Sequence, residues 1–211
     1  MKQRKQFLNH LEDLTSTVFK MSHEVEVRIG QLIQQVEKRD EKALKDLAIE
    51  DVHINDLEIL INEKIVSIIT LEAPVASDLR MLISYIKIAE DLERISDNVV
   101  NVANILAKHD IKHQEIKNKL VTMLKLCELM LIDVTSAMKT KDLTLVREIM
   151  TRDEDVDAIY LEITSSSIYE IDDRVLMSQV SLITKFIERI EDHIENIGEH
   201  QFFYLTGQQY Q

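Results

Sequence analysis

The chain has very few of the residues that interrupt helices. Among its 211 residues there are 3 glycines and 1 proline, whereas 30% of the residues are charged. Tight turns and sheets rely on glycine and proline, so the scarcity of both argues against a β-rich or mixed fold. We therefore expect an all-α protein built from long helices.

Cysteine is nearly absent as well, since Cys127 is the single one in the chain. A lone cysteine excludes an intrachain disulfide and fits a reducing compartment. Cys127 lies in the segment LKLCELML at an apolar helical position, which indicates a core thiol rather than a nucleophile. The N-terminal MKQRKQFLNHLEDL has no apolar signal-peptide core, and no apolar run approaches the ~20 residues of a membrane span. These absences lead us to expect a cytoplasmic location.

An excess of basic residues is also missing, because the formal net charge is −13. Nucleic acids and anionic lipids require a basic surface, so neither is expected as a partner. A glycine-rich phosphate-binding loop is absent too, which argues against a nucleotide or a bare phosphate as a direct ligand.

Apolar residues instead recur every three or four positions along almost the whole chain, which predicts a series of amphipathic helices. Asp40 is placed as the N-cap of a short helix within KRDEKALKDL, and Pro74 suits the first turn of a later helix. The segment HDIKH is the most polar interruption and is expected to be a mid-chain hinge. The expected long helices cover residues 7–36, 51–69, 74–108, 114–138 and a final stretch ending near 205, with shorter helices after 40, after 142 and over 153–163.

The sequence contains an internal repeat. With an offset of 102 residues, KRDEKALKDLAIEDVHINDLE aligns on TKDLTLVREIMTRDEDVDAIY, so that Asp40 meets Asp142. With an offset of 95, EDLERISDNVVNVA aligns on KFIERIEDHIENIG, so that Asn101 meets Asn196. The difference of seven residues is close to two helical turns and indicates a deletion in the second unit, in the hairpin before its third helix. We expect two tandem three-helix bundles over 1–109 and 114–205, followed by a polar tail over 206–211.

The third helix of each unit carries acidic and amide residues opposite an apolar stripe. The stripes are formed by Ile88, Leu92, Ile95, Val99, Val102 and Leu106, and by Ile183, Ile187, Ile190, Ile194 and Ile197. A solvated back face would explain acids alone, and Glu90 followed by Arg94 has the favourable i,i+4 order. However, a Glu, an Asp and an Asn occupy the same three aligned positions of the third helix in both units. Moreover, Glu93–Asp97 and Glu188–Asp192 are like-charge pairs that repel unless a cation lies between them.

Carboxylates one helical turn apart can share a hard cation through oxygen ligands. We therefore predict one metal site in each unit, for a divalent or ferric ion such as Mg, Mn, Zn or Fe. The principal ligands are Glu93 and Asp97 in the first unit, and Glu188 and Asp192 in the second. Further candidate ligands are Glu90, Asn101, Asp51 and Asn55 in the first unit, and Asn196, Asp153 and Asp157 in the second.

The segment APVASDLRMLISYIKIAEDLERISDNVVNVA resembles the third helix of a PhoU domain, whose hallmark is Glu-or-Asp-x-x-x-Asp preceded by Asp-Leu-Arg. Glu93–Asp97 and Glu188–Asp192 fit this motif, and residues 78–80 supply Asp-Leu-Arg. The resemblance covers essentially the whole chain, including the doubled layout and the FYLTG ending. Members commonly have glycine inside the motif, where this chain has Ser96 and Glu191, and Glu191 adds a charged side chain beside the second site.

The resemblance implies a cytoplasmic accessory protein of a phosphate-specific transport system. It implies a negative regulator that links the phosphate ABC transporter to a phosphate-sensing histidine kinase and reaches the membrane only through these partners. Homodimers and metals on the acidic faces are implied as well. On this hypothesis the protein is a regulatory adaptor and not an enzyme.

The alternative is a metal store or a metal-dependent phosphohydrolase that uses the same acids. Hydrolysis by two metals requires ions about 3.5–4 Å apart with an open position. A di-iron carboxylate centre requires Glu-x-x-His on two helices, and Glu50–His53 is the only such pair in the chain. His193 stands beside the acids of the second unit, where a solvated or salt-bridged histidine is a simpler interpretation than a ligand. No nucleophile with an adjacent base can be identified.

Overall fold

The structure of the protein is a computed structural model that describes residues 2–49 and 51–210. The side chains of residues 2, 3, 49, 51, 153 and 170 are not among those described. The elements in chain order are α1 (Lys2–Glu37), α2 (Glu41–Ile49), α3 (Asp51–Glu72), α4 (Ala76–Lys108), α5 (Gln114–Thr140), α6 (Leu143–Ile149), α7 (Asp153–Ser165), the 3₁₀ helix η1 (Ser167–Glu170) and α8 (Arg174–Thr206). The described residues contain no strand, and none of their helices combines the length and apolarity of a membrane span.

The ends of the helices follow local signals in the sequence. The Asp40 carboxylate accepts hydrogen bonds from the backbone N–H groups of Lys42 at 2.8 Å and Ala43 at 3.2 Å, so it caps α2 as expected. Pro74, in contrast, lies outside the helix in whose first turn we expected it. Val75 adopts an extended conformation with φ −90° and ψ 169°, and this conformation delays the start of α4 to Ala76.

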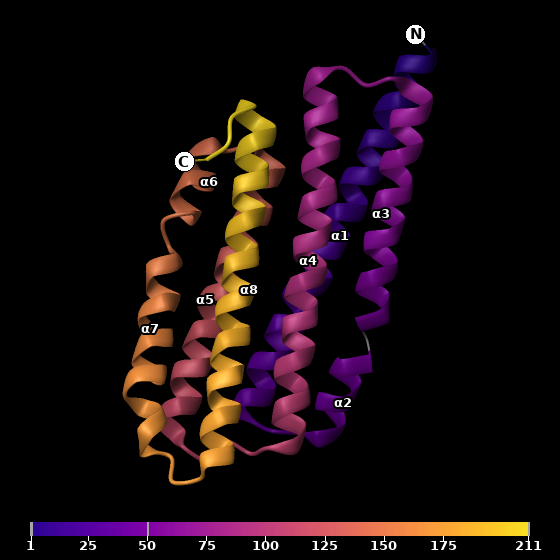
Figure 1. The fold of residues 1–211 in the computed structure, drawn as a ribbon. Coiled ribbons are helices and arrows are strands. Elements are labelled where there is room, and N and C mark those ends of the chain that lie inside the picture. Colours follow the sequence, from indigo (N-terminus) through magenta and orange to yellow (C-terminus); the bar gives the residue numbers. More distant parts are fainter. Residues whose placement is uncertain (1, 50, 211) are drawn as a thin grey trace.

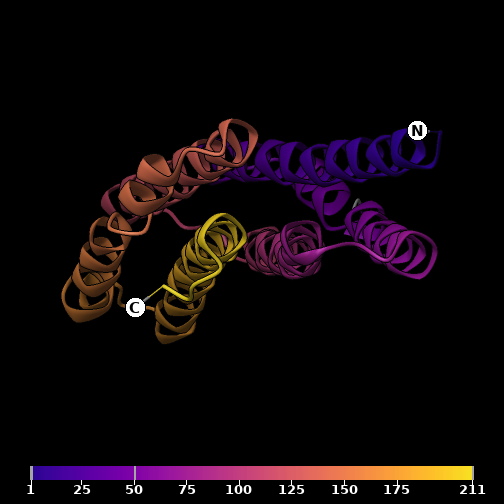
Figure 2. The same cartoon turned by 90° about the horizontal axis from the view of Figure 1, so that it is seen from above.

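The helices form two three-helix bundles side by side. α1, α3 and α4 pack together in the first bundle, and α5, α7 and α8 in the second. α4 and α8 run antiparallel next to each other in the middle of the molecule, while α3 and α7 lie at its outer edges (Figure 1). Seen from above, α1 and α5 lie on one side of this row (Figure 2). The expected all-α architecture of two tandem three-helix units is confirmed.

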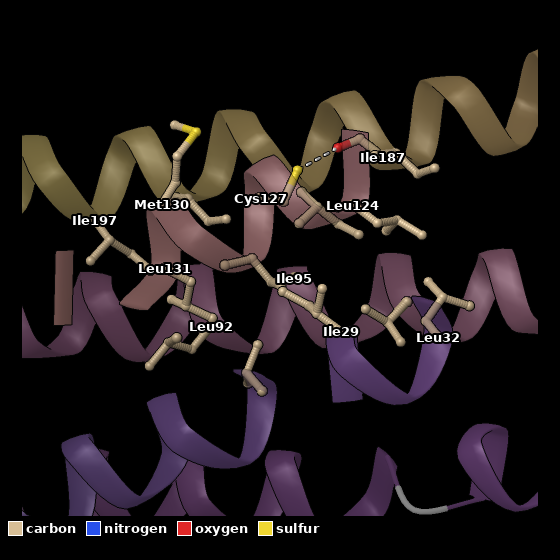
Figure 3. Packing of buried hydrophobic residues seen from close by; sticks show 14 of the residues in the cluster. Ile29, Leu32, Leu92, Ile95, Leu124, Cys127, Met130, Leu131, Ile187 and Ile197 are labelled. Atoms are coloured by element: carbon tan, nitrogen blue, oxygen red, sulfur yellow. Dashed lines mark hydrogen bonds between the residues drawn. The ribbon is translucent and has the colours of Figure 1, made fainter. Parts of the chain in front are cut away.

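The two apolar stripes form the inner faces of α4 and α8. Every residue of both stripes is at most 4% exposed. Cys127 is fully buried between α5 and α8, and its thiol donates to the carbonyl of Ile187 at 3.8 Å (Figure 3). Burial raises the pKa of this thiol far above its usual value, as expected for a core cysteine. Because each buried aliphatic side chain contributes about 1.5–3 kcal/mol, these helices are held together mainly by their stripes.

The middle helices of the two units differ in length. α3 has 22 residues, whereas α7 has 13 and is followed by the short η1. At the end of the chain, Gly207 caps α8 with a positive φ of 74°, and Tyr210 packs edge-on against Phe202 with ring centroids 5.3 Å apart. The chain after α8 therefore turns back onto the second unit.

Candidate functional site

A polar groove of about 630 Å³ lies between α4 and α8. Its walls are formed by Arg94, Asp97, Asn98, Asn101, Arg189, Asp192, His193, Glu195 and Asn196. Four pairs of these residues are related by the repeat offset of 95. Three pairs are identical in type, namely Arg94 with Arg189, Asp97 with Asp192, and Asn101 with Asn196, whereas the fourth joins Asn98 to His193. Antiparallel packing of α4 on α8 thus places corresponding parts of the two repeated motifs along one shared groove, and the metal site expected in each unit stays a prediction.

In the first unit, an arginine lies between the two acids of the motif. The guanidinium of Arg94 is 3.4 Å from the Glu93 carboxylate and 3.3 Å from that of Asp97. This internal cation offsets the repulsion between Glu93 and Asp97 and removes one reason to require a metal. Glu90 does not pair with Arg94 as its spacing suggested, because it bonds Lys87 at 2.8 Å and is exposed.

In the second unit, Glu188 is paired with Lys185 one turn earlier on α8. Partial burial raises the pKa of Asp192, and the negative charges of Glu188 and Asp157 add to this effect, although Lys185 and His193 oppose it. Asp157 of α7 therefore lies within electrostatic reach of Asp192. The three carboxylates create a negative potential that a cation would relieve.

The predicted ligands at the start of α3 and α7 are described only in part. The side chains of Asp51 and Asp153 lie outside the described residues. Asn55 Oδ1 is buried and has no hydrogen-bond partner in the described part of the chain, so an oxygen ligand is available there. Among the side chains that are described, no group of three or more histidine, cysteine or acidic residues is arranged to hold a metal ion.

Glu191, which we expected to add a charged side chain beside the second site, is buried in the core. Glu191 is 2% exposed, and its negative charge adds to the effect of burial in raising the pKa of Cys127. Ser96, at the corresponding position of the first unit, is fully buried. Both residues face inward because each lies four residues after one stripe position and three before another: Ser96 between Leu92 and Val99, and Glu191 at the corresponding place in α8.

A buried carboxylate joins the two units beside the groove. Asp91 of α4 is 7% exposed and lies 2.9 Å from His193 Nδ1, 3.2 Å from His200 Nε2 and 3.4 Å from Asn196 Nδ2, all on α8. The ring of His193 therefore pairs with a carboxylate of the other unit. The side-chain amide of Asn196, one of the further candidate ligands, also donates a hydrogen bond to Asp91.

Sequence reasoning missed Asp91, although a signal for it existed. The residue lies three positions after Ile88 and four before Ile95, so a helical wheel turns it partly inward. His193 and His200 are seven residues apart and share a face of α8. The pairing of these two faces could be recognised only from the packing of α4 on α8.

Comparison with known proteins places this geometry in context. The model of the PhoU domain matches residues 18–106 and again 120–200. The phosphate-specific transport system accessory protein PhoU homolog of Clostridium acetobutylicum is 30% identical, over 98% of this chain and 97% of the relative. The accessory protein PhoU of Escherichia coli K12 is 30% identical, over 97% of this chain and 87% of the relative.

Two solved structures have the same fold. The crystal structure of the phosphate transport system regulatory protein PhoU from Streptococcus pneumoniae superposes with a TM-score of 0.89 at 23% identity, covering 97% of this chain and 99% of that one. The crystal structure of PhoU from Pseudomonas aeruginosa gives 0.86 at 26% identity, covering 96% and 100%. The doubled three-helix architecture is therefore shared over essentially the whole chain.

Proposed function

The chain belongs to the PhoU family, and from this premise we propose that it is a regulatory accessory protein of a phosphate-specific transport system. The observation that carries the proposal is that similarity to relatives described as accessory proteins of this system extends over nearly the whole chain. A likeness confined to a single helix would support only a shared element. A likeness over both units supports a shared role.

In this role the protein acts in the cytoplasm as an adaptor and negative regulator. It links the phosphate ABC transporter to a phosphate-sensing histidine kinase, works as a homodimer, and meets the membrane only through these partners. The support is the resemblance of its repeated motif to that of the family. A formal net charge of −13 also favours docking on basic partner surfaces, with an attraction that salt screens. We assign no catalytic step to it.

Binding experiments test the adaptor role. The full-length protein is immobilised and offered the ATPase subunit of the phosphate transporter or the sensor kinase, at about 50 mM and about 300 mM salt. We expect both proteins to bind and both associations to weaken at the higher salt. Absence of binding to both proteins contradicts the role, and sedimentation of the protein alone tests the homodimer.

The acids along α4 and α8 are also proposed to hold hard cations. The support is chemical: Asn55 offers an unpaired buried oxygen, and the pKa of Asp192 is raised by partial burial and further by the negative charges of Glu188 and Asp157. A cation would use Glu93, Asp97 and Asn55 in the first unit, and Glu188, Asp192 and Asp157 in the second. When bound, it would supply positive charge that bridges carboxylates. It would have to displace Arg94 and Lys185 from the acids that they now pair.

Replacing one acid of each motif tests these cation sites. We expect Asp97→Asn and Asp192→Asn each to weaken metal binding by at least about tenfold, because each removes one ligand charge while keeping the side-chain shape. Elemental analysis after loading with Mn²⁺, Zn²⁺ or ferric iron measures the bound metal, and circular dichroism checks that folding is unchanged.

The matched control is Glu154→Gln, at an exposed position of α7 that is not a predicted ligand. Metal content that stays the same in Asp97→Asn and Asp192→Asn contradicts the assignment. Turnover of a phosphate ester that is lost in Glu93→Gln would instead favour the metal-dependent phosphohydrolase.

A further inference from the structure

The helix α3 has apolar residues on two opposite sides. Ile54, Ile61 and Ile65 face the core and are at most 1% exposed. Val52, Ile59 and Val66 are 65%, 55% and 63% exposed. Because these three follow one another at intervals of seven residues, they lie on one side of the helix. Among the described residues, α3 makes its main contacts with α1, α2 and α4 and lies at the edge of the molecule (Figures 1 and 2), and the exposure of these three residues shows that this side faces outward.

Acidic side chains alternate with these apolar ones. Asp56 and Glu63 stand four residues after Val52 and Ile59, and both are exposed. We call the five residues Val52, Asp56, Ile59, Glu63 and Val66 the outer stripe. At 1.5 Å per residue the outer stripe is about 21 Å long.

No ion pair within the described residues neutralises the acids of the outer stripe, although Asp56 borders a pocket that Arg28 also lines. Asp56 and Glu63 form no ion pair with any of the described residues. The two basic side chains of α3 pair with acids of α1 instead: His53 lies 3.1 Å from Glu24, and Lys64 lies 2.7 Å from Asp13. The outer stripe therefore combines exposed apolar surface with uncompensated negative charge.

The second unit does not repeat the outer stripe. The offset of 102 places Glu154, Ala158, Leu161 and Ser165 at the positions of Val52, Asp56, Ile59 and Glu63. Of these four, Leu161 is the one that keeps an exposed apolar side chain at an apolar position of the stripe. The same offset places Ile168 at the position of Val66, but Ile168 lies in η1 beyond the end of α7 and is buried, with 7% exposed. The outer stripe is thus a property of the first unit and is not required by the fold that the two units share.

The charges decide what kind of molecule can cover this surface. Parallel pairing of two copies would place Asp56 against Asp56 and Glu63 against Glu63, and antiparallel pairing centred on Ile59 would place Asp56 close to Glu63. Both arrangements bring like charges together, as would an anionic membrane. We infer that the outer stripe docks a basic amphipathic helix of another protein, with apolar residues every seven positions and Lys or Arg beside Asp56 and Glu63. This surface is separate from the groove, and the inference does not depend on the accessory role.

A pair of peptides tests the inference. The probe is a labelled helical peptide of about 22 residues, longer than the outer stripe, with Leu at every seventh position and Lys four positions after each Leu. Two matched peptides replace the Lys by Glu or scramble the order of the same residues. Fluorescence anisotropy with the full-length protein should show binding of the basic peptide that weakens about tenfold between about 50 mM and about 300 mM salt. The two matched peptides should bind at least about tenfold more weakly.

Variants of the protein locate the site. Ile59→Asp should reduce the affinity for the basic peptide by about tenfold or more, whereas Leu161→Asp, at the corresponding and 61% exposed position of α7, should leave it unchanged. Exchanging both Asp56 and Glu63 for Lys should transfer the preference to the acidic peptide.

Three results would overturn the inference. The first is equal binding of the basic and the scrambled peptide, which would indicate non-specific attraction to an acidic protein. The second is an Ile59→Asp variant that binds the basic peptide with unchanged affinity. The third is a homodimer of the free protein that Ile59→Asp dissociates in sedimentation, which would show that a second copy covers the outer stripe. If the protein fails to bind the transporter ATPase and the kinase, that result contradicts the accessory role and leaves the inference about the outer stripe unaffected.

Discussion

At the scale of single residues, Asp91 shows how a buried charge is accommodated between the two units. Burial by itself raises the pKa of this carboxyl, but the hydrogen bonds from His193 and His200 outweigh it and hold the pKa below its usual value. A carboxylate with a lowered pKa stabilises the fold above the pKa of the unfolded chain, near 3.9. That contribution is lost as the pH falls through the lowered value.

We predict that Asp91→Asn lowers the free energy of unfolding by about 2 kcal/mol at neutral pH, because charged hydrogen bonds across the α4–α8 contact are lost. The difference from the unsubstituted protein should shrink as the pH falls below about 4. Urea unfolding followed by circular dichroism between about pH 7 and pH 3 measures this. Glu90→Gln, on the exposed neighbour, should change stability by less than about 0.5 kcal/mol, and a difference that does not depend on pH argues against the prediction.

At the scale of elements, the turn between α3 and α4 holds a residue in a costly conformation. Ala73 has a positive φ of 45° and is exposed, directly before Pro74. An alanine in the left-handed region costs roughly 1–2 kcal/mol, whereas glycine adopts it freely. The reversal between these two long helices is therefore less stable than a glycine would make it.

Ala73→Gly should raise the free energy of unfolding by about 0.5–1 kcal/mol, since relief of the positive φ exceeds the added freedom of the unfolded chain. Ala158→Gly, in the exposed middle of α7, should lower it by about 1 kcal/mol. Thermal unfolding of the two variants gives the comparison. Equal destabilisation by both substitutions would mean that residue 73 is helical in solution.

At the scale of the whole molecule, the two units share one apolar core. The buried cluster includes Ile29 and Ile95 of the first unit as well as Cys127 and Ile187 of the second (Figure 3). The contact of α4 with α8 joins the halves along most of their length (Figure 1). Such a continuous core favours unfolding in one cooperative step.

We predict that Ile190→Ala, at a fully buried position of α8, costs about 3 kcal/mol through lost burial and the cavity that remains. The slowest exchanging amides should then exchange faster in both units by the same factor, because they exchange only on global opening. Hydrogen exchange with mass spectrometry separates the units, and Leu182→Ala on the exposed face of α8 is the control. Faster exchange confined to 114–205 would show that the units unfold independently.

The fold could be predicted from the sequence because its determinants are local. Amphipathic periodicity marks which side of each helix is buried, and the Asp40 cap marks a helix start within one turn. The repeat required only an alignment of the chain on itself. Pro74 was misplaced because proline is compatible both with a first helical turn and with the extended segment before it.

The candidate site could be predicted only in part. Helix geometry placed Glu93, Asp97, Glu188 and Asp192 away from the apolar stripes, and this follows from spacing alone. The sequence did not reveal that Arg94 lies between two of these acids, because a long flexible side chain can reach several partners. It did not reveal the shared groove, because spacing within one helix says nothing about the helix packed against it.

By itself the sequence determined the helices, their inner faces and the doubling of the three-helix unit. Only the tertiary structure decided that Asp91 faces two histidines of the other unit, that Glu191 is buried, and that the outer side of α3 is left uncovered. The physical reason is distance along the chain. Interactions within one or two helical turns are set by neighbouring residues, whereas contacts between residues about a hundred positions apart exist only once the two bundles have packed together.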